Sequence, residues 1–418
     1  MSLFGCAGND VDKVLLKNLY VTRDYLHLLK TNRYYWKLVT TNPYFVSWKK
    51  LLTCSEFVIY SGTNENEDLF INACRKGLII RTCLLIEKPN INIHACDELA
   101  FSLSCFYSKY QTVKWLLTIG PQYGYINIYA QGANVFHQCT NTSSQKILNL
   151  LLSQYNNPFF GKCCRKDFFK TTFVDCCHQN MIRSIKKIYS LDQQQDKSTI
   201  VLTNEMFINA CEKGYYNLAK WLLEESRRSK RPINIHAKSD KAIEKCIEHK
   251  RIRLVKWLID LTVRGECGPF DNLNLVFRDC CRHGMFSTAK LLIDLSTKKE
   301  IDHININNLF DYAFRFSCAN GYLDIAKWLL TLSQNPPYKL IDIHAKNEFA
   351  FYESCARGQF DVVKWLIDIS INPKYGYINI HTMRNAAIKK SYNKGNYHIT
   401  KFLMDLSSDH RYGNADNL

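Results

Sequence analysis

The sequence contains two groups of cysteine and histidine whose residue types could hold a metal ion. One combines the Cys-Cys pair at 163–164 with Cys-Cys-His at 176–178, and the other is Cys-Cys-Arg-His at 280–283. Thiolates and imidazoles are the usual zinc ligands, but zinc sites normally space their paired cysteines as Cys-x2-Cys. Neither group has this spacing. In addition, adjacent cysteines on a helix point in different directions, so they do not readily bind one metal ion. We interpret both groups as packing residues, and the sequence predicts no metal site and no cofactor.

A larger set of cysteines follows a long period. Nine of the eighteen cysteines fall in one column: Cys74, Cys105, Cys139, Cys177, Cys211, Cys246, Cys281, Cys318 and Cys355. A small, weakly polar side chain suits a crowded helix interface, where cysteine behaves as a small hydrophobe. Neighbouring members should lie about 8–10 Å apart, beyond the Cα separation of about 7 Å that a disulfide tolerates. We therefore assign Cys211, Cys318 and Cys355 to a structural core.

Four histidines form a second column, and each closes a short alternating segment of the type Ile-Asn-Ile-His. They are His94, His236, His344 and His381. Stacked segments would hold these imidazoles about 8–10 Å apart, too far to share one metal ion. We expect each to hydrogen-bond to the backbone of the neighbouring turn and so to fasten one segment to the next.

Lysine forms a third column: Lys114, Lys186, Lys220, Lys256, Lys290, Lys327, Lys364 and Lys401. Such a stripe could follow the acidic groups of a partner or of nucleic acid. Four residues after some of these lysines stands an aspartate, at 260, 294, 368 and 405, which could pair with it. We interpret the stripe as a solvated, partly self-neutralised face, and the basic run at 227–231 as an exposed loop.

These columns exist because the chain repeats one unit from about residue 66 onward. Apolar residues at 254, 257, 258 and 261 follow the i, i+3, i+4, i+7 spacing of a helix, and glycines such as Gly214 mark where a preceding helix ends. Ten equivalent positions recur at intervals of 32 to 37 residues: Cys83, Trp115, Leu150, Lys187, Trp221, Trp257, Leu291, Trp328, Trp365 and Phe402. The five tryptophans of this set are expected in the core. Ten copies predict a stacked solenoid, because one helix pair cannot bury its own apolar face.

Helix, glycine turn, helix and alternating arm at this period resemble the ankyrin repeat. Ala-Cys-Glu-Lys-Gly at 210–214 looks like its Ala-Ala-x-x-Gly, and Val-Val-Lys-Trp-Leu-Ile at 362–367 looks like its second helix. Tryptophan in that helix together with Ile-Asn-Ile-His-Ala most resembles the divergent ankyrin proteins of large DNA viruses. The resemblance implies an all-α, ankyrin-like repeat solenoid of about ten helix pairs with extended hairpin arms, over residues 66–406. A polar tail at 407–418 is expected to fray.

The first sixty residues form a separate segment, predicted to be a small helical module. Its apolar pattern resembles a degenerate F-box, with Leu28 and Leu29, then Trp36, then Pro43 and then Trp48 in the places of the motif. The resemblance implies that these five residues hold the helices that meet a Skp1-type linker protein. It also implies a role as substrate adaptor of a cullin-type ubiquitin ligase.

Composition and motif content narrow the class of protein further. The chain has 418 residues and a net charge of +17, which favours acidic partners. No apolar run approaches the roughly 18 residues of a membrane span, and the start lacks the pattern of a secretory signal. We expect an intracellular protein, in the host cytoplasm if the viral resemblance holds. No nucleotide-binding, zinc-protease or nucleophile-elbow motif occurs, so we expect no enzyme.

The sequence thus favours a non-enzymatic protein that recognises a protein partner through its repeats. Two alternatives stay open at this point: a passive scaffold without a link to a ligase, and a basic solenoid that binds nucleic acid. We expect neither a small-molecule substrate nor a membrane partner.

Overall fold

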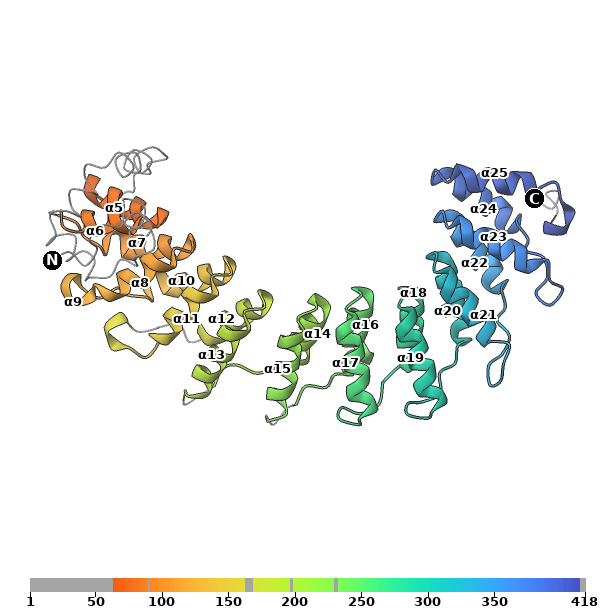
Figure 1. Ribbon diagram of the computed structural model, residues 1–418, viewed down its shortest axis with the longest axis horizontal. Coiled ribbons are helices and arrows are strands. Elements are labelled where there is room, and N and C mark those ends of the chain that lie inside the picture. The colour runs from red at the N-terminus through yellow and green to blue at the C-terminus, as the bar shows by residue number, and fades with distance from the viewer. Residues whose placement is uncertain (1–62, 89, 162–167, 196–197, 229–231, 414–418) are drawn as a thin grey trace, which may run out of the picture. The chain divides into compact units, whose positions relative to one another are not determined.

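The computed structural model describes residues 63–413, apart from residue 89 and the ranges 162–167, 196–197 and 229–231 (Figure 1). These residues form 21 α-helices and two 3₁₀ helices, and none of them lies in a strand. The all-α class predicted from the sequence is confirmed. The F-box-like segment at 1–60 and the Cys-Cys pair at 163–164 lie outside the described residues.

Contacts divide the chain into two units, Met1–Val201 and Leu202–Leu418. The boundary falls inside the range 66–406 that the sequence treats as one stretch. The described helices of the first unit are α5 (Glu65–Lys76), α6 (Ile79–Leu85), α7 (Ala95–Phe106), α8 (Tyr110–Thr118), α9 (Gly120–Tyr123), α10 (Ala130–Asn141), α11 (Gln145–Ser153), η1 (Pro158–Phe160), α12 (Phe168–His178) and α13 (Ile182–Gln193).

The second unit continues with the same alternation of first and second helices. It comprises α14 (Asn204–Lys213), α15 (Tyr216–Ser226), α16 (Ala237–Glu248), α17 (Ile252–Val263), α18 (Leu273–Arg282), α19 (Phe286–Thr297), α20 (Asn308–Ala319), α21 (Leu323–Leu332), α22 (Ala345–Ala356), α23 (Phe360–Ser370), α24 (Thr382–Asn393), α25 (Tyr397–Leu406) and η2 (His410–Tyr412).

Within each unit the helices pack in consecutive pairs. In the first unit α5, α7, α10 and α12 contact one another in that order, and in the second unit α14, α16, α18, α20, α22 and α24 do the same (Figure 1). Each of these first helices also packs against the second helix that follows it. A short helix has one apolar face, and this order buries that face between neighbours.

The first helices approach one another closely because one position holds only small residues. It is the residue whose carbonyl accepts a hydrogen bond from the N–H five residues later, in the turn between the two helices. Its occupants are all buried: Ala73, Ser104, Cys139, Cys176, Ala210, Cys246, Cys280, Ser317, Ser354 and Ser391. The sequence-based cysteine column therefore merges two positions. Cys139 and Cys246 belong here, whereas Cys211, Cys318 and Cys355 stand one residue later and are also fully buried.

The tryptophans of the second helices are less buried than the sequence suggests. Only Trp115 is buried, and Trp221, Trp257, Trp328 and Trp365 are half-buried. The rings of Trp257, Trp328 and Trp365 reach back to the preceding helix pair. In the second unit Trp257 lies 6.3 Å from the Phe207 ring and 5.5 Å from the Tyr216 ring. These tryptophans thus pack at the edge between two successive helix pairs and not at the centre of one helix pair.

The turn inside each pair places one residue in the left-handed backbone region. Gly284 (φ 77°) and Gly395 (φ 78°) both occupy this position. A Cβ at Gly284 would stand 2.5 Å from the Tyr322 ring, but a Cβ at Gly395 would meet no atom within 4 Å. We expect Gly395→Ala to lower the free energy of unfolding by about 1 kcal/mol, the cost of left-handed backbone. Gly284→Ala should cost about 1–3 kcal/mol more, because the ring must move.

Urea unfolding of the two alanine variants measures this difference. Equal losses would contradict the close approach of Tyr322 to the turn.

The arms between pairs differ from the expected extended hairpins. No strand forms in these segments, which end in a turn that leads into the next first helix. Their isoleucines are the part that packs: Ile233 and Ile235, and likewise Ile341 and Ile343, are buried. The predicted tail contains the short 3₁₀ helix η2. Tyr412 is buried, and its carbonyl accepts from the N–H of Ile380 (3.0 Å).

The predicted fastening role of the arm histidines is confirmed for three of the four. The Nε2 atoms of His94, His236 and His344 lie 3.1, 3.1 and 2.7 Å from the carbonyl oxygens of Tyr123, Gly268 and Tyr375. The fourth, His381, contacts Asn385 through Nδ1 at 2.6 Å.

A carboxylate four residues after each of these three histidines completes the link. Nδ1 of His236 lies 2.6 Å from Asp240 Oδ1, and the other oxygen of Asp240 accepts the Asn272 N–H at 2.6 Å. His94 with Glu98 and His344 with Glu348 form a similar link, but there a single carboxylate oxygen, Oε1, faces the imidazole and also accepts the arm N–H, from Asn127 and from Asn379 respectively. Each pair of side chains therefore holds the end of its own helix pair and the arm of the next.

His344 makes this link sensitive to pH. Its two ring nitrogens face a carboxylate and a carbonyl, which both accept, so the protonated ring satisfies both. The hydrogen bond to Glu348 raises the pKa of His344 to about 9, from an ordinary value of about 6.5. Its contribution to stability is complete below pH of about 6.5 and is lost as the pH rises through about 9.

We expect the stability difference between the wild type and His344→Gln to shrink over that pH window. Thermal unfolding of both chains at a series of pH values checks it, and a difference that stays constant to pH above 9 would rule out the charged ring.

Candidate functional site

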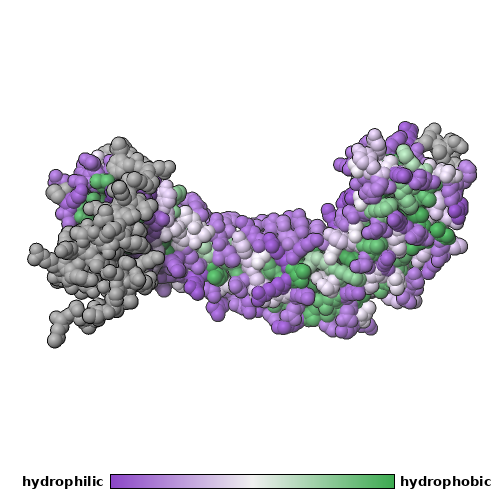
Figure 2. Space-filling model, turned by 45° about the horizontal axis from the view of Figure 1, so that its top comes forward, coloured by the Kyte–Doolittle hydropathy of each residue, from purple (hydrophilic) through white to green (hydrophobic). Residues whose placement is uncertain are grey.

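The second unit carries a cluster of aromatic rings on its first helices. Tyr312 and Phe316, one turn apart on α20, stack with centroids 4.1 Å apart, and Phe349 of α22 lies 5.2 Å from Phe316. All three rings are half-buried. Figure 2 shows hydrophobic residues grouped over the C-terminal helix pairs of this unit and bordered by hydrophilic ones. Half-exposed rings of this kind are typical of protein-interaction surfaces.

Cationic side chains lie over these rings. The guanidinium of Arg278 stands 5.1 Å from the Tyr312 centroid, and that of Arg282 stands 5.5 Å from the Phe316 centroid. On α24, Lys390 Nζ lies 4.5 Å from the centroid of Tyr352 in α22. We call this set the cation–aromatic face, and its members are Arg278, Arg282, Phe310, Tyr312, Arg315, Phe316, Lys346, Phe349, Tyr352 and Lys390. Each cation–ring contact contributes about 0.5–2 kcal/mol, depending on its burial.

Arg315 joins the face to the left-handed segment 309–311 at the start of its own helix, α20. Its Nε donates to the Phe310 carbonyl (2.6 Å) and its Nη2 donates to the Leu309 carbonyl (2.9 Å), while its guanidinium lies 4.8 Å from the Phe349 centroid. Arg315 is only 6% exposed. Burial lowers its pKa below the usual value. The arginine therefore holds Leu309 and Phe310 in place beside the helices, and these two side chains are 54% and 64% exposed.

A buried carboxyl borders the same face. Asp279 on α18 is 6% exposed, and burial, followed by the nearby charge of Glu244, raises its pKa to about 6. Arg282 and Arg278 act in the opposite direction. The negative charge of Asp279 is thus only partly developed near pH 6, and the edge of the face at α18 is more basic in mild acid than at higher pH.

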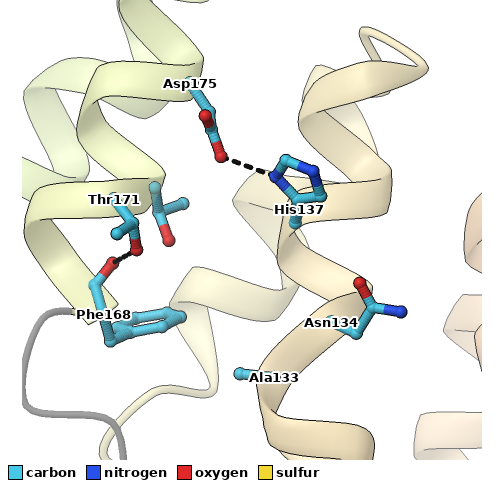
Figure 3. A pocket seen from close by; sticks show the side chains of 7 residues that line it. Ala133, Asn134, His137, Phe168, Thr171 and Asp175 are labelled. Atoms are coloured by element: carbon cyan, nitrogen blue, oxygen red, sulfur yellow. Dashed lines mark hydrogen bonds and ion pairs between the residues drawn. The ribbon is translucent and has the colours of Figure 1, made fainter.

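The first unit holds a pocket of about 290 Å³ between α10 and α12 (Figure 3). His137 Nδ1 lies 2.7 Å from Asp175 Oδ2, and the amide of Asn141 stands 3.0 Å from His137 Nε2. A histidine oriented by an aspartate is found in nucleophilic catalysis, but there the second nitrogen faces the nucleophile. Here it faces Asn141, and the nearby hydroxyl of Thr171 donates to the Phe168 carbonyl (3.1 Å). The arrangement is that of a polar contact between two helices.

The cysteines and histidines at 176–178 and 280–283 form no metal site in the part of the chain that the structure describes. Within it, no three His, Cys, Asp or Glu side chains come together as a metal site, and every cysteine there is a free thiol. Cys280 and Cys281 are buried, and burial raises the pKa of both thiols well above the ordinary value. Cys176 is buried and Cys177 is half-buried.

The lysine column is exposed throughout, but two of its four expected aspartate partners pair elsewhere. Asp260 binds Arg264 and Asp294 binds Lys298, both at 2.8 Å and four residues further along. Lys290 and Lys364 lie over Phe286 and Phe360, one turn earlier, at 4.1 and 4.2 Å from the centroids. The interpretation as a self-neutralised stripe is therefore wrong for these positions.

The site residues proposed for the N-terminal segment, Leu28, Leu29, Trp36, Pro43 and Trp48, lie outside the described residues. The cation–aromatic face was not predicted. Its signal in the sequence is the spacing of aromatic residues at 312, 316, 349 and 352, one turn apart or in equivalent places on successive first helices. No described helix has the length and apolar character that a membrane crossing requires.

Comparison with known proteins adds no family. No family model matches the chain, and no curated protein shows significant similarity to it.

Proposed function

We propose that this chain is a divergent ankyrin-like repeat protein that acts without catalysis and recognises a protein partner through its repeats. The helix pairs, with their small-residue column and left-handed turns, support the ankyrin-like part of the proposal. The observation that carries the recognition role is the cation–aromatic face. It combines arginine, tyrosine and phenylalanine, which dominate the energetics of protein interfaces.

The F-box resemblance extends this proposal. A chain that binds a Skp1-type linker through residues 1–60 and a second protein through its helix pairs would act as a substrate adaptor for a cullin-type ubiquitin ligase. The proposed location is the cytoplasm of a host cell. The passive scaffold differs from the adaptor only in lacking the linker contact.

Affinity purification of the full chain beside a chain lacking residues 1–60 tests both parts. The adaptor proposal expects a Skp1-type protein with the full chain only, and a further partner with both. Capture of that further partner without a Skp1-type protein would favour the passive scaffold over the adaptor. Absence of any specific protein from both purifications would overturn the recognition proposal.

The nucleic-acid alternative has its own test. Binding dominated by phosphates weakens steeply as salt rises, so a labelled duplex and a labelled single strand are titrated with the full chain at several salt concentrations. We expect no tight complex at physiological salt. A tight complex whose affinity falls linearly in log–log coordinates would favour the basic solenoid that binds nucleic acid.

A further inference from the structure

We propose that the cation–aromatic face of the second unit takes an acidic protein segment that also carries aromatic or aliphatic side chains. This inference rests on the proposed function and names the chemical class of the partner. It follows from the balance of charge on the face, from the exposed apolar groups beside it, and from the way its rings are covered.

The acidic groups of the face already have partners inside the molecule. Glu353 binds Arg357 at 3.0 Å. Asp311 accepts from Asn307 (2.7 Å) and from the N–H of Asp342 (3.0 Å), and Glu348 holds His344 and the next arm. These carboxylates are therefore not free to attract a basic partner.

The two lysines of the face, in contrast, have no carboxylate partner in the described part of the chain. Lys346 Nζ lies 4.0 Å from the Phe310 centroid and Lys390 Nζ lies 4.5 Å from the Tyr352 centroid. Neither lysine forms an ion pair within the described part of the chain. Both are exposed. Their charge is left for a partner, and a carboxylate that meets a lysine over a ring gains an ion pair at the edge of an apolar contact.

Two exposed apolar residues at the start of α20, Leu309 and Phe310, indicate the apolar part of the partner. Leu309 and Phe310 are held by the two hydrogen bonds of the buried Arg315. These bonds fix the backbone that carries the two side chains, so less conformational entropy is lost when a partner covers them. An aromatic or aliphatic side chain of the partner can cover Leu309 and Phe310 while its acidic neighbours reach Lys346 and Lys390.

Two other occupants fit less well. A second copy of this chain brings a net charge of +17 toward a basic face and is repelled. A single-stranded nucleic acid needs free ring faces for its bases. Here Tyr312 and Phe316 stack on each other, and cations cover Phe310 and Tyr352. An acidic polypeptide is therefore the occupant that the face favours.

The test uses the full chain and four fluorescent probes. The first is a peptide of about sixteen residues that alternates Asp or Glu with Leu or Phe. The second replaces its acids by lysine, the third replaces its apolar residues by serine, and the fourth is an oligothymidylate of equal charge. Fluorescence anisotropy measures the affinity of each probe. We expect the first peptide to bind at least tenfold more tightly than the other three.

Two double variants locate the binding. Lys346→Glu with Lys390→Glu reverses the charge at the two exposed lysine positions of the face, and we expect it to weaken binding of the first peptide at least tenfold. Lys290→Glu with Lys364→Glu is the matched control. It makes the same change in net charge and also removes two lysines from aromatic rings, at 4.1 and 4.2 Å, but on second helices. The control should bind as the wild type does, and thermal unfolding verifies that both variants fold.

Four results would overturn the proposal: equal weakening in both double variants, equal binding of the serine peptide, tighter binding of the oligothymidylate, or self-association of the chain through this face. Failure of the proposed function looks different, because the full chain then captures no protein at all. A captured partner that is insensitive to the Lys346 and Lys390 changes would remove this inference and leave the recognition role intact.

Discussion

Replacement of Asp240 by alanine is expected to lower the free energy of unfolding by about 3–5 kcal/mol. Asp240 is fully buried between helix pairs of the second unit. One of its oxygens meets His236 Nδ1 at 2.6 Å, and the other accepts the Asn272 N–H at 2.6 Å. Alanine would leave the buried imidazole of His236 and the part-buried N–H of Asn272 without their acceptor, and an unsatisfied buried group costs about 1–3 kcal/mol.

A matched control lies in the same unit, on the preceding first helix, α14. Glu205 forms an ion pair with Lys238 at 2.5 Å, but both side chains are largely exposed. Exposed pairs contribute about 0–1 kcal/mol, so Glu205→Ala should change stability little. Urea unfolding of the two variants and the wild type makes the comparison. A loss for Asp240→Ala no larger than that for Glu205→Ala would show that the carboxylate does not fasten successive pairs.

The second large effect is expected for Phe314→Ala in α20. Phe314 is fully buried, and its ring lies 6.2 Å from that of Trp365 on the following pair. Truncation of a buried phenylalanine removes apolar burial and leaves a cavity, at a cost of about 3–5 kcal/mol. Hydrogen exchange should show that the loss of protection extends to the neighbouring helices α18 and α22.

Phe310→Ala provides the contrast, because that ring lies in the same segment but is exposed. We expect its thermal stability to stay close to that of the wild type and its affinity for the acidic peptide to fall. Equal destabilisation by both alanine variants would contradict the assignment of Phe314 to the core and of Phe310 to the surface.

Much of the helical framework could be predicted because it follows from local chemistry. The left-handed turn favours glycine, although Lys250 also occupies it, and helical periodicity marks the apolar stripe, so the helix pairs of the second unit stand where the sequence predicts them. The fastening role of His236 and His344 was also accessible, since a stacked arm leaves a turn carbonyl within reach.

Other features of the structure depend on three-dimensional geometry, which the spacing of residues in the sequence does not determine. Cys139 and Cys246 differ from Cys211 by one position, which only the hydrogen bonds of the turn reveal. Tryptophan satisfies an apolar pattern both at the centre of a pair and at its edge, so the half-exposure of Trp257 could not be predicted. The face itself depends on Arg315, which donates to the carbonyls of Leu309 and Phe310 in the left-handed segment at the start of α20, and helical periodicity does not predict that segment.

The measurement that tests recognition by the first helices most directly is lysine labelling of the full chain with and without its captured partner. Both sides of the helix pairs carry exposed lysines, so the molecule contains its own control. We predict that the partner protects Lys346 and Lys390 from acetylation, whereas Lys290 and Lys364 on the second helices react at an unchanged rate. Protection of Lys290 and Lys364 alone, or equal reactivity of all four lysines with and without partner, would contradict recognition through this face.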